Sequence, residues 1–290
     1  MPSPLHPLIE KHQVVVSAGV WDALSARIAE RAGFRSIVVS GYAVSASLLG
    51  EPDFGILTQS EVLDTARRIC RAVKIPVIVD GDTGYGGALN VQWMVTELVR
   101  MGARGILLED QTWPKRCGHM RGKSVVPLED HVQKIRAAVA ARAASPQPFI
   151  ITARTDALGP RGIDEAIRRG RAYGEAGADV IFVEAPESIE QMRRITSEIP
   201  GIKSLNNIEG GRTPVQSLEE AHALGYFAIG FVLTGLFAAA KALEDAYGHL
   251  LTHGTSRGFE DRMMDFDSFA RLVGLDEKYA LDERYRSEGD

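Results

Sequence analysis

Short apolar runs alternate along the chain with longer stretches in which apolar residues recur at helical spacing. Each run is about four to six residues long and apolar on both faces, which is typical of strands buried within a parallel sheet. The predicted strands cover residues 14–18, 36–40, 75–80, 105–109, 149–153, 180–184, 202–205 and 227–231. The pattern therefore predicts buried strands joined by helices.

The helices predicted between these strands cover residues 22–31, 59–73, 89–101, 128–143, 163–176, 188–198 and 217–224. Several are followed by a glycine just before the next strand, namely Gly33, Gly102, Gly177 and Gly225. Glycine accepts the left-handed conformation that closes a helix. This repeated order predicts an α/β fold, a single (β/α)8 barrel of the TIM type over residues 1–250. Residues 251–290 are predicted to form a C-terminal helical extension.

The charge balance and the composition exclude several classes of partner. The 290 residues include 33 Lys and Arg against 38 Asp and Glu, a net charge of −5 that disfavours binding to a nucleic-acid backbone. No apolar run approaches the roughly 20 residues of a membrane-spanning helix, and no signal peptide is visible. Cys70 and Cys117 are too few for a disulfide framework, so we expect a cytoplasmic protein.

Charged residues follow several of the predicted strands, at the end of a barrel where catalytic groups lie. Asp80 and Asp82 flank one glycine after the third strand, and Glu109 ends the fourth. Carboxylates sharing one cavity repel each other unless a cation neutralises them, and their hard oxygens suit Mg²⁺ or Mn²⁺. The alternative is that each acid caps the following helix or turn.

Arg154 follows the fifth predicted strand and adds a cation to the same end of the barrel. A guanidinium can hold a substrate carboxylate through two parallel hydrogen bonds. The alternative is an ion pair with Glu184 or Glu109, and the two roles can coexist. The sequence therefore predicts an anion-binding pocket beside the acidic residues.

A long loop after the fourth strand contains Lys115, Arg116, Cys117, Gly118 and His119. Basic neighbours would favour the thiolate form of the cysteine, and a thiol of tuned pKa can act as a general acid or base. The glycines and charges of this loop predict a mobile lid, although an ordinary surface loop with an incidental cysteine is the alternative. Cys70, in contrast, lies on a predicted helix among apolar residues and is expected to pack in the core.

Taken together, these segments resemble the isocitrate lyase/phosphoenolpyruvate mutase superfamily over almost the whole chain. The resemblance is carried by residues 40–45, 52–55, 79–86, 108–111, 115–119, 153–157, 183–186 and 208–211. The sequence Lys-Arg-Cys-Gly-His at 115–119 is typical of the carbon–carbon lyase branch. Within that branch, Tyr42 and the run 113–123 are most similar to the group of 2,3-dimethylmalate lyase and petal death protein.

This resemblance implies a role for each matching residue. Asp80 would contact Mg²⁺ directly, and the residues holding the waters of the ion would be Asp53, Asp82 and Glu109. The substrate carboxylate or oxyanion would bind at Ser40, Gly41 and Tyr42. The pocket would be lined by Arg154, Glu184 and Asn206 and closed by Cys117, Gly118 and His119.

The implied reaction is the retro-aldol cleavage of a 2-alkylmalate-type hydroxy diacid into an α-keto acid and a carboxylate. Cys117 would donate the final proton, Arg154 would bind the substrate, and Tyr42 or a metal-linked carboxylate would be the base. Methylisocitrate lyase, oxaloacetate hydrolase or decarboxylase, and carboxyphosphonoenolpyruvate mutase are the alternative activities. A catalytically inactive binding protein is the alternative from another class.

The resemblance also implies a homotetramer, a dimer of dimers in which the last helix is exchanged between protomers. The partner of the site would be a small di- or tricarboxylate. One departure concerns Asn206 and Asn207, because relatives often have Asn-Met or Asn-Ile at this point. The extra amide adds polarity nearby, so the side-chain preference at the cleaved carbon stays open.

Overall fold

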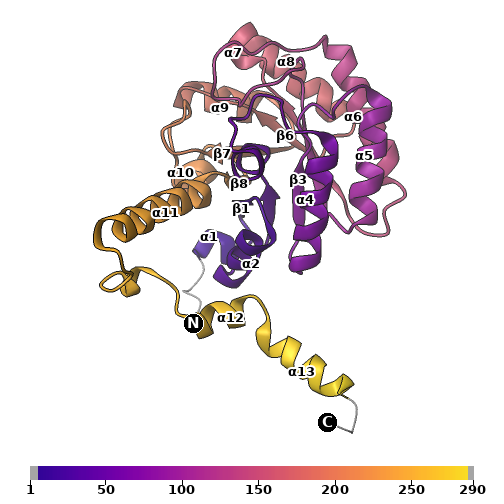
Figure 1. The fold of residues 1–290 in the computed structure, drawn as a ribbon. Coiled ribbons are helices and arrows are strands. Elements are labelled where there is room, and N and C mark those ends of the chain that lie inside the picture. Colours follow the sequence, from indigo (N-terminus) through magenta and orange to yellow (C-terminus); the bar gives the residue numbers. More distant parts are fainter. Residues whose placement is uncertain (1–5, 287–290) are drawn as a thin grey trace. The chain divides into compact units, whose positions relative to one another are not determined.

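The computed structural model describes residues 6–286 and contains a closed barrel of eight parallel strands in sequence order (Figure 1). The strands are β1 (Val15–Val20), β2 (Ile37–Val39), β3 (Val77–Asp80), β4 (Gly105–Glu109), β5 (Ile150–Thr155), β6 (Val180–Val183), β7 (Ile202–Asn207) and β8 (Ala228–Phe231). The barrel closes through the pairing of β1 with β8. The predicted TIM-type barrel is therefore confirmed, and every predicted strand overlaps an observed one.

Helices follow the strands and cover the outside of the barrel (Figure 1). The predicted ones are α2 (Ala23–Ala32), α4 (Gln59–Ala72), α5 (Ala88–Arg100), α6 (Leu128–Arg142), α8 (Ile163–Glu175), α9 (Ile189–Glu198) and α10 (Leu218–Ala223). Short helices that the periodicity did not predict are α1 (Pro7–Glu10), α3 (Gly41–Val44) with the π-helix η1 (Ser45–Leu49), and α7 (Leu158–Arg161). A helix this short has too few turns to leave an apolar pattern in the sequence.

Local signals fix where the long helices begin and end. The side chain of Thr58 accepts the N–H of Glu61, whose carboxylate in turn accepts the N–H of Thr58, so a capping box starts α4. Asp22 begins α2 in the same way with Ser25. The predicted glycine stops are confirmed, because all have left-handed backbone: Gly33 (φ 99°), Gly102 (φ 89°), Gly177 (φ 102°) and Gly225 (φ 94°).

The main core lies between the strands and the helices that cover them. The side chains of Ile106 and Leu108 on β4 and of Met94 and Leu98 on α5 are fully buried. A fully buried aliphatic side chain contributes about 1.5–3 kcal/mol to stability. This layer therefore holds β4 and its neighbours rigid, so that residues at the strand ends have fixed positions.

The chain divides into two compact units, one ending at Leu236 and the other beginning at Phe237. The second contains most of α11 (Thr234–His253), the 3₁₀ turn η2 (Glu260–Arg262), α12 (Phe266–Leu272) and α13 (Leu275–Tyr285). The predicted boundary after residue 250 thus falls within α11. None of the side chains of α11 is buried.

The ends of the two predicted domains, residues 1–5 and 287–290, lie outside the described residues. Over the part of the chain that the structure describes, no helix combines the length and the apolar character needed to cross a membrane.

A buried histidine on α6 makes the stability of the fold depend on pH. His131 is fully buried against Tyr173, with 4.7 Å between the ring centroids. Burial lowers the pKa of His131 to about 4, although the Asp110 carboxylate opposes this shift. In the unfolded chain the pKa of histidine is about 6.5, so below that pH the unfolded state takes up a proton that the folded state refuses.

Above pH 6.5 His131 is neutral in both states and does not lower the free energy of unfolding. As the pH falls from 6.5 towards 4, protonation of His131 in the unfolded chain progressively lowers that free energy. We expect His131→Leu to reduce the loss of unfolding free energy between pH 7.5 and 4.5 by about 2–3 kcal/mol. Urea unfolding of both proteins at the two pH values measures this difference. An identical loss in both proteins would show that His131 does not cause it.

Candidate active site

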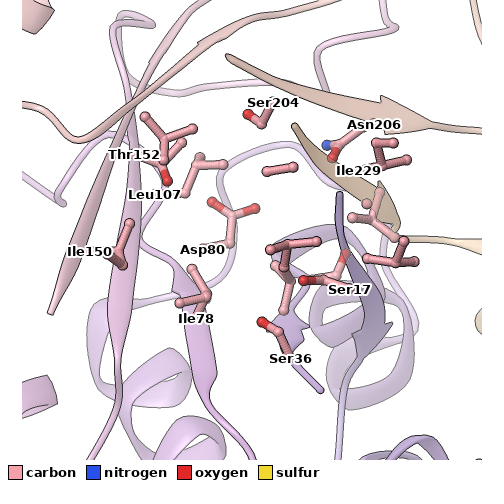
Figure 2. Close-up of a pocket in the computed structure, with 18 of the residues that line it drawn as sticks. Ser17, Ser36, Ile78, Asp80, Leu107, Ile150, Thr152, Ser204, Asn206 and Ile229 are labelled. Carbon is pink, nitrogen blue, oxygen red and sulfur yellow. The ribbon is translucent and has the colours of Figure 1, made fainter. Parts of the chain in front are cut away.

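The predicted site residues converge at the carboxyl ends of the barrel strands, within the first unit. A cavity of about 700 Å³ runs along the inside of the barrel, from this end to residues that precede the strands, such as Phe34, Pro76 and Phe227. Figure 2 shows Asp80 of β3 pointing into it, with Ser204 and Asn206 of β7 facing the same space. The predicted residues among those lining it are Ser40, Tyr42, Asp53, Asp80, Cys117, Gly118, His119, Arg154, Glu184 and Asn206.

The turn after β3 holds two carboxylates in a fixed arrangement. Asp80 accepts the backbone N–H of Asp82 at 3.1 Å and that of Gly41 at 3.3 Å. A Cβ on Gly41 would lie only 3.2 Å from oxygens of both acids, so glycine lets the backbone approach them closely. Burial, reinforced by the neighbouring Asp82, raises the pKa of Asp80 to about 6. Asp80 therefore brings a carboxylate into the pocket lining, and Asp82 is buried beside it.

Lys115 reaches from the long loop into this acidic cluster. Its ammonium is buried, 2.8 Å from Oδ2 of Asp53 and 2.5 Å from Oδ1 of Asp82. We predicted that Lys115 would favour a thiolate at Cys117, and this was wrong because the ammonium pairs with the carboxylates instead. Sequence spacing did not reveal this contact, which joins residues far apart along the chain.

Glu109, at the end of β4, has both carboxylate oxygens buried without a hydrogen-bond partner, and so has Oδ1 of Asp82 despite its ion pair. Unsatisfied buried oxygens are unfavourable, and they are the ligands that Mg²⁺ accepts. Among residues 6–286, no three His, Cys, Asp or Glu side chains are grouped to hold a metal ion by themselves. Mg²⁺ commonly binds through one or two carboxylates and retains several waters, so the donor set fits this ion.

Arg154 lies between the acids of three strands. Its Nη1 is 2.7 Å from Oε2 of Glu184, and its Nη2 is 3.3 Å from Oε2 of Glu109. The predicted ion pairs are therefore present. A further partner was missed, because Asp156 receives Nε at 2.7 Å and Nη2 at 3.1 Å. The acid two residues after the arginine was the available sequence signal, since alternate residues of a strand face the same side.

The loop containing Cys117 is packed over Arg154 and Glu184. The backbone N–H of Cys117 donates to the carbonyl of Asp53 at 3.0 Å, and His119 Nε2 lies 3.2 Å from Oε1 of Glu184. A Cβ on Gly118 would lie 2.3 Å from Cγ of Glu184 and 2.4 Å from Nη2 of Arg154. Only glycine therefore fits at residue 118 in this closed arrangement.

The Cys117 thiol is protonated in this environment. Burial raises its pKa to about 11, and the Glu184 and Asp53 carboxylates add to the shift. The thiolate predicted from the basic neighbours was therefore wrong. A protonated thiol at the edge of the pocket is arranged to donate a proton rather than to attack as a nucleophile.

Ser40 and Tyr42 follow β2 and were predicted to bind the substrate. Ser40 accepts the backbone N–H of Ala43 at 3.4 Å and so begins α3. Burial, with Cys117 and Asp53 nearby, raises the pKa of Tyr42, which disfavours its use as a base.

Asn207, the extra amide of this chain, is not among the residues that line the pocket. It is fully buried and binds the backbone of Gln216 in both directions, at 2.8 and 3.0 Å. Asn206, the preceding residue, lines the pocket. The alternation of side chains along β7 places these two amides on opposite faces.

Comparison with known proteins is consistent with this geometry. Residues 5–251 match the family model of phosphoenolpyruvate phosphomutase. The petal death protein of Dianthus caryophyllus is 46 % identical over 98 % of this chain and 89 % of its own length. The chloroplastic carboxyvinyl-carboxyphosphonate phosphorylmutase of Arabidopsis thaliana is 45 % identical over 97 % of this chain and 83 % of its own length. The 2,3-dimethylmalate lyase of Eubacterium barkeri is 43 % identical over 97 % of this chain and 96 % of its own length.

Solved structures show the same architecture. Oxaloacetate acetylhydrolase with 3,3-difluorooxalacetate superposes with a TM-score of 0.90 at 36 % identity, covering 98 % of this chain and 96 % of its own. A 2,3-dimethylmalate lyase superposes with a TM-score of 0.89 at 34 % identity, covering 99 % of this chain and 98 % of its own. Phosphonopyruvate hydrolase with oxalate and Mg²⁺ gives 0.84 at 31 % identity, with 95 % of both chains covered.

Proposed function

This chain belongs to the phosphoenolpyruvate mutase/isocitrate lyase superfamily, and we propose that it is a Mg²⁺-dependent lyase acting on a 2-alkylmalate-type 2-hydroxy diacid. Cleavage of a substrate such as 2,3-dimethylmalate between C2 and C3 would give an α-keto acid and a carboxylate. The observation that carries this proposal is the placement of Cys117 in the lining of a pocket that also contains Arg154 and Asp80. Relatives named 2,3-dimethylmalate lyase and 2-methylisocitrate lyase support the lyase class.

Four acids would hold the metal ion. Asp80 would contact it directly, while Asp53, Asp82 and Glu109 would hold its waters, and Mn²⁺ would serve in its place. When bound, the ion would act as a Lewis acid on the 2-hydroxyl and the neighbouring carboxylate of the substrate. The unsatisfied oxygens of Glu109 support this assignment.

The chain's own residues would bind the substrate and supply the proton. Arg154 presents a fixed guanidinium to a substrate carboxylate, and Ser40, Gly41 and Tyr42 lie across the pocket near Asp80. Glu184, Asn206 and His119 complete the wall. Cys117 would protonate the carbanion carbon of the departing carboxylate fragment. The loop over the pocket would exclude bulk water.

A phosphonomutase is the alternative supported by a specific observation, the 45 % identity to a phosphorylmutase. Methylisocitrate lyase and oxaloacetate hydrolase or decarboxylase are alternatives within carbon–carbon chemistry. We favour the 2-alkylmalate activity because the group-specific residues, Tyr42 and the run 113–123, match the 2,3-dimethylmalate lyase group.

For the assembly, we propose a cytoplasmic homotetramer built from helix-swapped dimers. The support is α11, whose side chains are all accessible although Phe237, Leu243, Tyr247 and Leu251 are large and apolar. An isolated protein rarely leaves such residues uncovered along one helix. Sedimentation equilibrium would show four chains per particle, and a monomer would contradict this assembly.

A substrate panel tests the activity directly. Native protein with Mg²⁺ would be given 2,3-dimethylmalate, other 2-alkylmalates, methylisocitrate, oxaloacetate and phosphonopyruvate. Keto-acid release would be followed for the hydroxy acids, loss of the keto acid and formation of oxalate for oxaloacetate, and phosphorus NMR for the phosphonate. We expect the highest kcat/KM for a 2-alkylmalate, because Tyr42 and the run 113–123 match the 2,3-dimethylmalate lyase group. Rearrangement of the phosphonate would establish the mutase instead. Stabilisation by Mg²⁺ and oxalate with no turnover of any compound would indicate a binding protein.

A further inference from the structure

A single buried carboxylate connects the loop over the pocket to the arginine beneath it. Oδ1 of Asp156 accepts the ammonium of Lys123 at 2.8 Å and Nη2 of Arg154 at 3.1 Å. Oδ2 accepts Nε of Arg154 at 2.7 Å. Lys123 belongs to the loop after β4, whereas Arg154 belongs to β5, so one oxygen atom is shared by cations from two different segments.

Asp156 is itself held rigidly from behind. Its backbone N–H donates to Oδ1 of Asp110 at 2.8 Å, and the Thr155 hydroxyl donates to Oδ2 of Asp110 at 2.8 Å. Arg169 and Tyr173 also donate to Asp110, at 2.9 and 2.7 Å. Asp110, Thr155 and Asp156 are all fully buried. Movement at this point must therefore come from the cations, not from the carboxylate.

The contact with Asp156 fixes the plane of the Arg154 guanidinium. Two nitrogens bind one carboxylate side by side, which is the most orientation-specific geometry available to arginine. Nη1 is left to point at Glu184, 2.7 Å away, on the pocket side. Asp156 is thus paired with two cations, Arg154 and Lys123. Without Lys123, the buried carboxylate would be paired with the guanidinium alone.

We propose that Asp156 and Lys123 are positioning residues that couple the seating of the loop to the orientation of Arg154. This inference rests on the proposed function only in giving Arg154 a carboxylate to bind. The loop touches Arg154 at a second point, because Gly118 packs against Nη2 without room for a Cβ. An unseated loop would therefore take Lys123 away from Asp156 and Gly118 away from Nη2 of Arg154 at the same time.

The test replaces Lys123 with a neutral side chain of similar length. We expect Lys123→Met to weaken the affinity for oxalate with Mg²⁺, measured by calorimetry, at least about tenfold, as is usual when a partner behind a ligand-binding group is lost. KM for the active hydroxy diacid should rise by a similar factor, with a smaller change in kcat. Lys123→Arg should restore both, because it keeps the cation.

The state of the loop has its own readout. Arg121 is exposed within the loop, so trypsin should cut there faster in Lys123→Met than in the native chain, and Lys123→Arg should again restore protection. Lys241→Met is the matched control, since Lys241 also binds carboxylates but is exposed on α11. It should change neither the affinity nor the cleavage.

Unchanged oxalate affinity in Lys123→Met, or a defect shared by Lys123→Arg, would overturn the positioning role. Unchanged cleavage at Arg121 would overturn the link to the loop. These measurements need no turnover, so a failed substrate panel would disprove the proposed activity without deciding this inference.

Discussion

Cys117→Ser should lower lyase turnover by about 10²–10⁴-fold, the usual contribution of a positioned general acid. The carbanion that leaves a retro-aldol cleavage is far more basic than a thiolate, so a thiol with a pKa of about 11 can protonate it readily. A serine hydroxyl is similar in shape but a much weaker acid. Keto-acid release under saturating substrate, compared with the native chain, measures this effect.

Cys70→Ser is the matched control, because burial also raises the pKa of Cys70 to about 11 but this residue lies on α4. It should retain native turnover. Binding of Mg²⁺ and oxalate should be intact in both variants, since neither thiol belongs to the acidic cluster. Native turnover in Cys117→Ser would remove Cys117 as the acid and weaken the case for a lyase of this type.

The barrel could be predicted because its signals are local. A buried parallel strand is apolar on both faces over a few residues, and Gly33 or Gly177 closes a helix through its own backbone. The convergence of Asp80, Glu109 and Arg154 then followed from topology, because all strands of such a barrel end on the same side. No knowledge of side-chain packing was needed for either step.

Side-chain directions within the loop could not be predicted in this way. Lys115 and Cys117 are near neighbours in sequence, yet the ammonium binds Asp53 and Asp82 while the thiol stays protonated. Which neighbour a flexible side chain chooses depends on groups brought close by folding. The pairing of Asp156 with Arg154 was available from their spacing, but its contacts with Lys123 and Asp110 were not, since these come from other segments.

The boundary between the two units was also beyond the sequence pattern. The sequence placed the end of the barrel domain after residue 250, because eight strand–helix units end near that point. The second compact unit begins earlier, at Phe237 within α11. Periodicity identifies a secondary-structure element, and only its burial shows what it packs against.

Asp80→Asn should lower turnover at least about 10²-fold, because it removes the carboxylate proposed to contact Mg²⁺ and the ion contributes several kcal/mol to transition-state stabilisation. The amide keeps the shape of the side chain, and its oxygen can still accept the N–H of Asp82. Excess chelator should abolish activity of the native chain, and added Mg²⁺ or Mn²⁺ should restore it. Asp64→Asn, which changes an exposed acid paired with Arg67 on α4, is the control and should behave as the native chain.

A readout without substrate separates loss of the metal from loss of the chemistry. Mg²⁺ at about one hundred times its Kd should raise the unfolding free energy of the native chain by about 2.7 kcal/mol, because only the folded state binds it. Asp80→Asn should lose this stabilisation, whereas Asp64→Asn should keep it. The unsatisfied Glu109 oxygens remain in Asp80→Asn, so residual stabilisation at higher Mg²⁺ would show that the remaining acids still bind the ion, with lower affinity. An Asp80→Asn protein with native turnover in excess chelator would refute the metal role of this cluster.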